Sequence, residues 1–168
     1  SGTTRKNPEV WRQWKPSGGL GLHSMQFGLL NRAVDLLKPG GRVVYSTCSL
    51  DPVENEAVIS QILQKREDVR LIGCSDNIDG VSIQEGLRSW VPTDDDMRPL
   101  EGSPWAHPPS EEISEALDKC IRVRGHTMDA GGFFLATMEK KHVQTEDVSG
   151  DISEVRFPED SVQASQPL

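Results

Sequence analysis

Cysteines and long apolar runs are both scarce in this sequence. Its 168 residues include 3 cysteines, an odd number, and no pair has the C-x-x-C spacing of zinc ligands or redox thiols. We therefore expect neither a disulfide framework nor a metal site, and we expect a reducing compartment. No apolar run approaches membrane-spanning length and no secretory signal opens the chain. The sequence thus predicts an intracellular protein, in the nucleus or the cytoplasm, without a membrane partner.

Hydrophobic residues are also few, at 35% of the chain, which is low for a globular domain even when 15 glycines are added. The length suits one domain or a part of one. A glycine-rich loop of the kind that cradles a nucleotide's phosphates is missing, because residues 18–21 (GGLG) follow no predicted strand. We therefore expect no cofactor-binding residues in this chain.

Positive charge is the third deficit, since 18 Lys and Arg stand against 26 Asp and Glu, a net charge of −8. Proteins that bind nucleic acid usually have a basic surface. The basic residues gather near the start of the chain, whereas the acids concentrate at residues 94–96, at 111–112 and after Lys141. If RNA is bound, the segment around Arg5 and Lys6 is its best contact, and an ordinary solvated surface is the alternative.

A cysteine at the end of a predicted strand is the most informative feature that is present. An apolar helical pattern ends at Leu37, and Pro39 followed by two glycines stops it. Residues 42–47 contain β-branched and aromatic residues without alternation, which is typical of a strand covered on both faces. Cys48 follows at the carboxyl end of that strand, where parallel α/β sheets place their chemistry.

A second helix is predicted directly after this cysteine. Asp51 is a suitable cap, Pro52 fits the first helical position, and the helix is expected over residues 52–66. A thiol that faces a helix N-terminus gains thiolate character, which favours a nucleophile at Cys48. From residue type and position alone, an inert, packed cysteine remains the alternative.

The remaining pattern predicts an α/β arrangement. The expected elements are a helical turn at 9–14, a helix over 20–37, strands at 69–74 and 88–91, a helix over 111–118, and an antiparallel hairpin of strands 119–124 and 133–139. Trp11 and Trp14 share a helical face, where packing is the ordinary interpretation and stacking on a base is the functional one. His23, Cys74 and Cys120 are expected to be structural. Residues 142–168 are expected to form an acidic, weakly structured tail.

Three stretches of the sequence resemble the Sun-type RNA cytosine-5 methyltransferases. Residues 45–56 (YSTCSLDPVENE) look like the Thr-Cys motif of that family. Residues 2–14 (GTTRKNPEVWRQW) are similar to the stretch after its Pro-Cys motif, in the form of the eukaryotic tRNA-modifying branch. Residues 131–134 (GGFF) resemble the loop and final strand of the same domain. The resemblance implies that residues 1–141 are the carboxyl-terminal half of a Rossmann-like, S-adenosylmethionine-dependent methyltransferase sheet that ends in an antiparallel hairpin.

The same resemblance implies a chemistry for Cys48. In that family the cysteine of the Thr-Cys motif adds to carbon 6 of cytosine, and carbon 5 then accepts a methyl group from S-adenosylmethionine. The residues expected to support the catalytic turn are Ser46, Thr47, Pro52, Glu54, Asn55 and Glu56, and those expected to bind RNA are Arg5, Lys6 and Asn7. A direct catalytic role for residues 54–56 stays open.

The resemblance also places the cofactor site before residue 1, together with the Pro-Cys motif. We therefore expect the 168-residue chain by itself to be inactive. RNA, and tRNA in particular, is the expected partner of the complete enzyme. The alternative function is a non-catalytic RNA- or protein-binding module that keeps the methyltransferase architecture.

Overall fold

Helices and strands alternate along much of the chain in the computed structural model. The structure describes residues 7–73, 80–106, 108–126 and 131–142. The helices are α1 (Pro8–Gln13), α2 (Pro16–Asp35), α3 (Glu56–Lys65) and α4 (Glu111–Ala116), with short 3-10 turns at Pro52–Glu54 and Leu117–Lys119. The strands are β1 (Arg42–Thr47), β2 (Val69–Ile72), β3 (Ile83–Glu85), β4 (Ile121–Val123) and β5 (Phe133–Lys140).

Strand β5 is the centre of the sheet. It pairs antiparallel with β1 along one edge and with β2 and β4 along the other, and β3 completes the sheet beside β4. Because β1 and β4 both run antiparallel to β5, their carboxyl ends lie at the same end of the sheet. The register places Phe134 between Thr47 on one side and Arg122 on the other.

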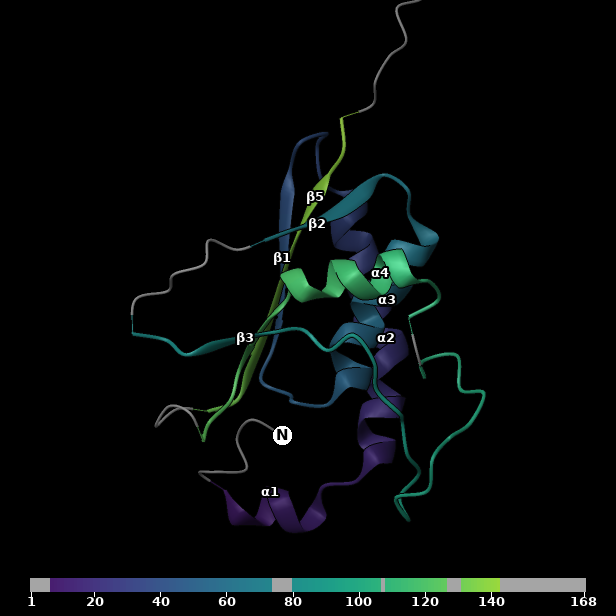
Figure 1. Cartoon of the computed structure of the whole chain (residues 1–168), viewed down its shortest axis with the longest axis vertical. Helices are drawn as coiled ribbons and strands as arrows, with labels where there is room; N and C mark the ends of the chain where they lie inside the picture. The colour runs from purple at the N-terminus through teal and green to yellow at the C-terminus, as the bar shows by residue number, and fades with distance from the viewer. Residues whose placement is uncertain (1–6, 74–79, 107, 127–130, 143–168) are drawn as a thin grey trace, which may run out of the picture.

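Helices α2, α3 and α4 lie together on one side of the strands, and α1 lies apart below them (Figure 1). Every second residue of β5 is buried, as expected for a strand with one covered face. The core lies between this face and the helices; its most buried members include Val34, Val58, Ile59, Ile62, Phe134 and Met138. A single helical layer therefore covers the sheet in the part of the chain that is described.

The predicted α/β arrangement and the hairpin of β4 and β5 are confirmed. The predicted cap at Asp51 also holds, because its side chain accepts a backbone N–H bond at the start of the 3-10 turn; Ser110 caps α4 in the same way. His23 and Cys120 are buried, in agreement with structural roles. Cys74 lies outside the described residues, as does nearly all of the expected tail at 142–168.

Three expectations about secondary structure were wrong. Strand β1 is not covered on both faces: its burial alternates and Val44 is 57% exposed, because no described element packs on its second side. Residues 88–91 are not a strand; the strand lies at Ile83–Glu85, and Trp90 instead buries its ring and donates its N–H to the Trp105 carbonyl. The single helix expected over 52–66 is broken at Asn55, because the side chain of this residue bonds to Thr47 and Ser49 instead of capping the helix.

Gly86 offers a test of the packing that joins β3 to the rest of the fold. A Cβ at this buried position would lie 2.3 Å from the Leu117 carbonyl oxygen and 2.9 Å from the Cys120 Cβ. Gly86→Ala should therefore lower the free energy of unfolding by about 1–3 kcal/mol, because the backbone must shift. Urea unfolding measures the change.

Gly28→Ala is the matched control for that substitution. Gly28 is an exposed residue inside α2, and a Cβ there meets nothing within 4 Å. Alanine should raise stability by about 0.5–1 kcal/mol through helix propensity. Equal effects of the two substitutions would contradict the close approach at Gly86.

Candidate active site

Strand β1 delivers Cys48 to an exposed position at its carboxyl end. The turn that follows is held by side chains rather than by regular secondary structure. Thr47 accepts the Ser49 backbone N–H on its hydroxyl oxygen (3.1 Å), and Ser49 in turn accepts the Asp51 N–H on its own (3.1 Å). These two local bonds shape the chain immediately after the cysteine.

Asn55 ties this turn to the start of α3. Its side-chain oxygen accepts the Thr47 hydroxyl (2.6 Å), and its amide donates to the Ser49 carbonyl (2.9 Å). Asn55 is the N-cap of α3, yet its side chain makes no capping bond. Its φ of −119° and ψ of −96° interrupt the helical path and turn the buried amide toward the cysteine loop. The break in the predicted helix thus allows the Asn55 side chain to bond to Thr47 and Ser49, the two neighbours of Cys48.

Glu54 adds a second set of contacts on the groove side. Its carboxylate accepts the Ser49 hydroxyl (2.6 Å) and the Gln26 amide (3.0 Å), while its carbonyl accepts the Tyr45 hydroxyl (2.6 Å). Burial, and then the nearby charge of Glu54, raises the pKa of Tyr45, so this phenol stays protonated and remains a donor at neutral pH. Burial also raises the pKa of Asp51, although the Val53 N–H bond opposes the shift.

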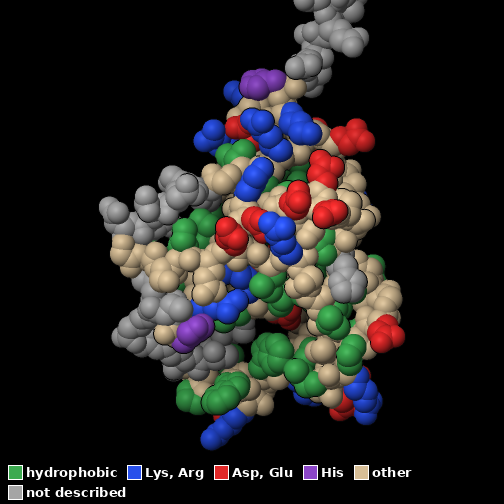
Figure 2. All heavy atoms as spheres, in the orientation of Figure 1, with side chains coloured by type: hydrophobic (Ala, Val, Ile, Leu, Met, Phe, Trp, Pro, Cys, Tyr) green, Lys and Arg blue, Asp and Glu red, His purple; other side chains and the backbone are tan. Residues whose placement is uncertain are grey.

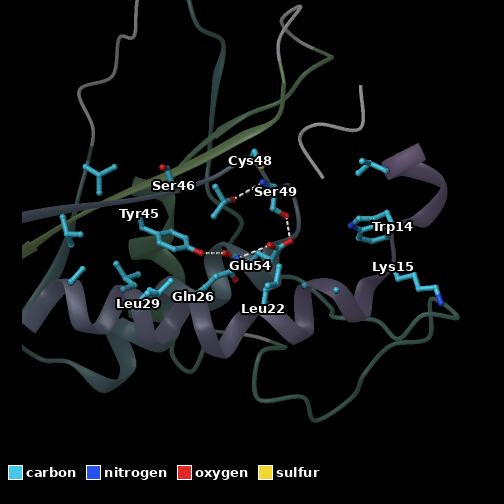
Figure 3. A pocket seen from close by; sticks show the side chains of 18 of the residues that line it. Trp14, Lys15, Leu22, Gln26, Leu29, Tyr45, Ser46, Cys48, Ser49 and Glu54 are labelled. Carbon is cyan, nitrogen blue, oxygen red and sulfur yellow. Dashed lines mark hydrogen bonds between the residues drawn. The ribbon is translucent and has the colours of Figure 1, made fainter. Parts of the chain in front are cut away.

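An open groove runs beside the cysteine, between α2 and the edge of β1 that pairs with no described strand. It has a volume of about 1000 Å³. Its lining residues include Trp14, Leu22, Leu29, Tyr45, Ser46 and Cys48, and Figure 3 shows Trp14 at one end with Leu22 and Leu29 along the α2 side. The groove is large and mainly apolar, with Cys48 at its rim.

Several predicted site residues meet in this region. Thr47, Asn55 and Glu54 contact the turn as described, and Pro52 begins the 3-10 turn behind it. Ser46 is exposed in the groove, and within the described ranges no hydrogen bond from its side chain to the turn is found. Asn7 lies elsewhere: it caps α1 by accepting the Glu9 N–H (3.1 Å). Arg5 and Lys6 lie outside the described residues.

The two tryptophans of the first helix do not pack as the ordinary interpretation expects. Helix α1 contributes no buried residue, Trp11 is 75% exposed and Trp14 is 41% exposed. In Figure 2, hydrophobic side chains are exposed at the lower end of the molecule, where Figure 1 places α1. The exposure of these rings favours the alternative, an aromatic surface available to a ligand.

Sequence reasoning missed the partner of Glu56. This carboxylate is fully buried and forms a two-bond ion pair with Arg122 of β4, which is 3% exposed. The three-residue strand around Arg122 carries no motif that would single it out. The pairing depends on tertiary contacts, so it has no local signal in the sequence.

The described residues contain few groupings that could hold a metal ion or a nucleotide. Among the described residues, no group of three or more His, Cys, Asp or Glu could hold a metal ion. The glycines at 18–21 lie inside α2 rather than in a loop between a strand and a helix, so they do not form a phosphate cradle. In the described part of the chain, no helix is long and apolar enough to span a membrane.

Comparison with known proteins defines the class. A solved methyltransferase homologue from Pyrococcus horikoshii matches with a TM-score of 0.53 and 30% identity, over 74% of this chain and 32% of that chain. The fold is thus that of an α/β methyltransferase, which confirms the fold class expected from the sequence. A family model described as 16S rRNA methyltransferase RsmB/F matches residues 1–139. The chain belongs to this family.

Two curated relatives modify tRNA. The chain is 41% identical over 160 residues to the multisite-specific tRNA:(cytosine-C(5))-methyltransferase of Saccharomyces cerevisiae, which covers 90% of this chain and 23% of that protein. It is 34% identical over 156 residues to the tRNA (cytosine(34)-C(5))-methyltransferase of Drosophila melanogaster, over 83% and 21% of the two chains. The chain therefore spans a little over a fifth of the length of these relatives.

The contribution of Asn55 to the turn can be measured directly. Asn55→Ala removes both side-chain bonds and leaves the Ser49 carbonyl without its amide donor, so the free energy of unfolding should fall by about 1–3 kcal/mol. Asn7→Ala is the control, because it removes an exposed cap from a helix that buries nothing. An Asn55 variant as stable as the Asn7 variant would contradict the role of the buried amide.

Proposed function

We propose that the complete protein is an RNA cytosine-5 methyltransferase that acts on tRNA, with Cys48 as the nucleophile. The supporting observation is an exposed thiol at the carboxyl end of β1, directly before a turn in which Thr47 and Asn55 bond to the backbone of Ser49. The relatives named above, two of which carry this activity in their names, support the same assignment. The function of a non-catalytic binding module would not depend on an accessible thiol beside a turn held by side-chain hydrogen bonds.

The proposed chemistry begins with the sulfur of Cys48. Carbon 5 of cytosine is a poor nucleophile, and a covalent bond from the thiolate to carbon 6 gives an enamine that is electron-rich at carbon 5. After substitution at carbon 5, loss of its proton and elimination of the thiol restore the aromatic ring. The chain's own contribution is an accessible sulfur on a turn whose following carbonyl is fixed by Asn55.

The methyl donor is proposed to be S-adenosylmethionine, held by residues outside this chain. In this proposal residues 1–141 are the carboxyl-terminal part of the catalytic domain. The rest of that domain then packs against the edge of β1 that no described strand covers and against the exposed apolar side chains of α2, Leu22, Met25 and Leu29. The acidic residues from 142 onward are proposed to lie outside it.

RNA is proposed to approach along α1. Trp14 lines the same groove as Cys48, and the exposed Trp11 lies one helical turn away from it. Aromatic faces of this kind stack on bases with little regard to sequence. Arg5, Lys6 and Asn7 directly precede or begin this helix, so phosphate contacts by Arg5 and Lys6 would align the RNA with the part of the groove that Trp14 and Cys48 line, while the rest of the domain packs on the part lined by Leu22 and Leu29.

Replacement of Cys48 tests the assignment. In the full-length protein, Cys48→Ala should abolish transfer of labelled methyl groups to tRNA, because loss of a covalent nucleophile raises the barrier by far more than the roughly 1.4 kcal/mol that a tenfold rate change represents. The melting temperature should stay close to that of the wild type, since the side chain is exposed.

Cys120→Ala is the matched cysteine control, because its thiol is buried in the core and should not contribute to the chemistry. This variant should keep its methyl-transfer rate. If Cys48→Ala retained a rate within about tenfold of the wild type, Cys48 would not be the nucleophile.

Salt dependence tests the RNA contacts. Replacing Arg5 and Lys6 with alanine should weaken tRNA binding similarly for different sequences and should reduce the slope of log affinity against log salt by roughly two charges' worth. The control replaces Arg42 and Arg70, which pair with Glu139 at the opposite end of β1. An unchanged slope for the first variant would assign Arg5 and Lys6 to an ordinary solvated surface.

A further inference from the structure

The ion pair between Glu56 and Arg122 is the most deeply buried charged contact in the described residues. Two guanidinium nitrogens, Nε and Nη2, each donate to a different oxygen of the Glu56 carboxylate at 2.5 Å. The same carboxylate also accepts the Leu87 backbone N–H at 2.9 Å. Helix α3, strand β4 and the segment after β3 therefore meet at one fixed charge cluster.

Arg122 has a third bond, and this one reaches the cysteine turn. Its Nη1 donates to the carbonyl oxygen of Leu50 at 3.0 Å, only two residues beyond Cys48. The sheet register accounts for the reach, since Thr47 and Arg122 flank the same residue, Phe134, on the two sides of β5. The guanidinium also lies over the Phe134 ring, 5.8 Å from its centre.

Consecutive carbonyls after Cys48 are thus held from two different elements. Asn55, at the start of α3, holds the Ser49 carbonyl, and Arg122, on β4, holds the Leu50 carbonyl. A planar guanidinium can bind a carboxylate with one edge and a carbonyl with another, which a lysine ammonium cannot do in the same geometry. The Arg122 guanidinium therefore fixes the distance between the Leu50 carbonyl of the turn and Glu56, the first residue of α3.

A contribution to stability alone is a weak explanation for this pair. Removing two charges from water costs so much that apolar residues of similar volume often stabilise such a position equally well or better. Here each charged group makes a further bond to the backbone, and one of those bonds ends on the loop that carries the thiol. The arrangement fixes geometry beside Cys48.

We infer that Arg122 is a positioning residue for the nucleophile: it holds the Cys48–Leu50 turn through the Leu50 carbonyl while Glu56 holds its guanidinium. The inference rests on the proposed role of Cys48. Because the charge of Arg122 is balanced by Glu56, its effect on the reaction is geometric. Loss of the Arg122 bonds to Glu56 and Leu50 keeps the thiol chemically intact but makes the turn more mobile. A smaller fraction of bound cytosines then meets a well-aligned sulfur.

Arg122→Met in the full-length enzyme is the test, with Arg66→Met as the matched control. Arg66 also binds several acceptors, on Asn31, Asp35 and Asp68, but it lies at the opposite end of α3. The kcat per folded molecule should fall by about tenfold or more in Arg122→Met, with the KM for tRNA little changed. Arg66→Met should retain the kcat, and Arg122→Lys should lie between Arg122→Met and the wild type.

Hydrogen exchange gives a readout that does not depend on activity. The backbone N–H groups of Ser49 and Asp51 are bonded inside the turn, so their exchange should be about tenfold faster in Arg122→Met and unchanged in Arg66→Met. Wild-type exchange at both amides in Arg122→Met would overturn the inference. If the wild-type enzyme transferred no methyl group, the proposed function would fail, and the exchange rates would still decide whether Arg122 holds the turn.

A double variant covers the case in which Arg122→Met does not fold. Glu56→Gln with Arg122→Met removes both charges and keeps an acceptor for the Leu87 N–H. This protein should fold, with a low kcat and fast exchange at the turn. A double variant with wild-type kcat and wild-type exchange would show that the pair serves stability only.

Discussion

Pairing of β5 with three other strands is the constraint on which the rest of the structure depends. This strand comes last among the described elements, yet it fixes the positions of β1, β2 and β4 through one continuous register. That register sets Thr47 and Arg122 on either side of Phe134, and so brings the cysteine turn within reach of β4. The link between the cysteine turn and β4 therefore depends on contacts between residues 72 (Leu50 and Arg122) and 87 (Thr47 and Phe134) positions apart.

Local signals in the sequence predicted the parts of the fold that depend on local chemistry. The stop at Pro39, the cap at Asp51 and the hairpin before β5 all follow from residues close together in the chain. The family resemblance named Thr47 and Asn55 among the residues that support the turn, but the bond between their side chains was not predicted, because Asn55 has the sequence position of an ordinary helix start. The Glu56–Arg122 pair was missed for a related reason: its two members are 66 residues apart.

The exposure of β1 was mispredicted, and the cause is informative. A run of β-branched and aromatic residues indicates a strand that is buried on both faces, yet described elements cover only one. Helix α2 has the same property, with buried residues such as Val34 on one side and exposed Leu22 and Leu29 on another. A helix with apolar residues on several sides is suited to burial on several sides. Both elements carry more apolar surface than the described residues cover.

The four tryptophans divide between two environments, which makes the protein's own fluorescence a two-site reporter. Trp90 is buried, and Trp105 packs against the core and the His23 ring. Trp11 and Trp14 face solvent near the groove. Because a buried indole emits at shorter wavelength than a solvated one, the first pair should emit to the blue of the second and be better shielded from soluble quenchers. Unfolding and occupation of the groove thus change different parts of one spectrum, without any attached dye.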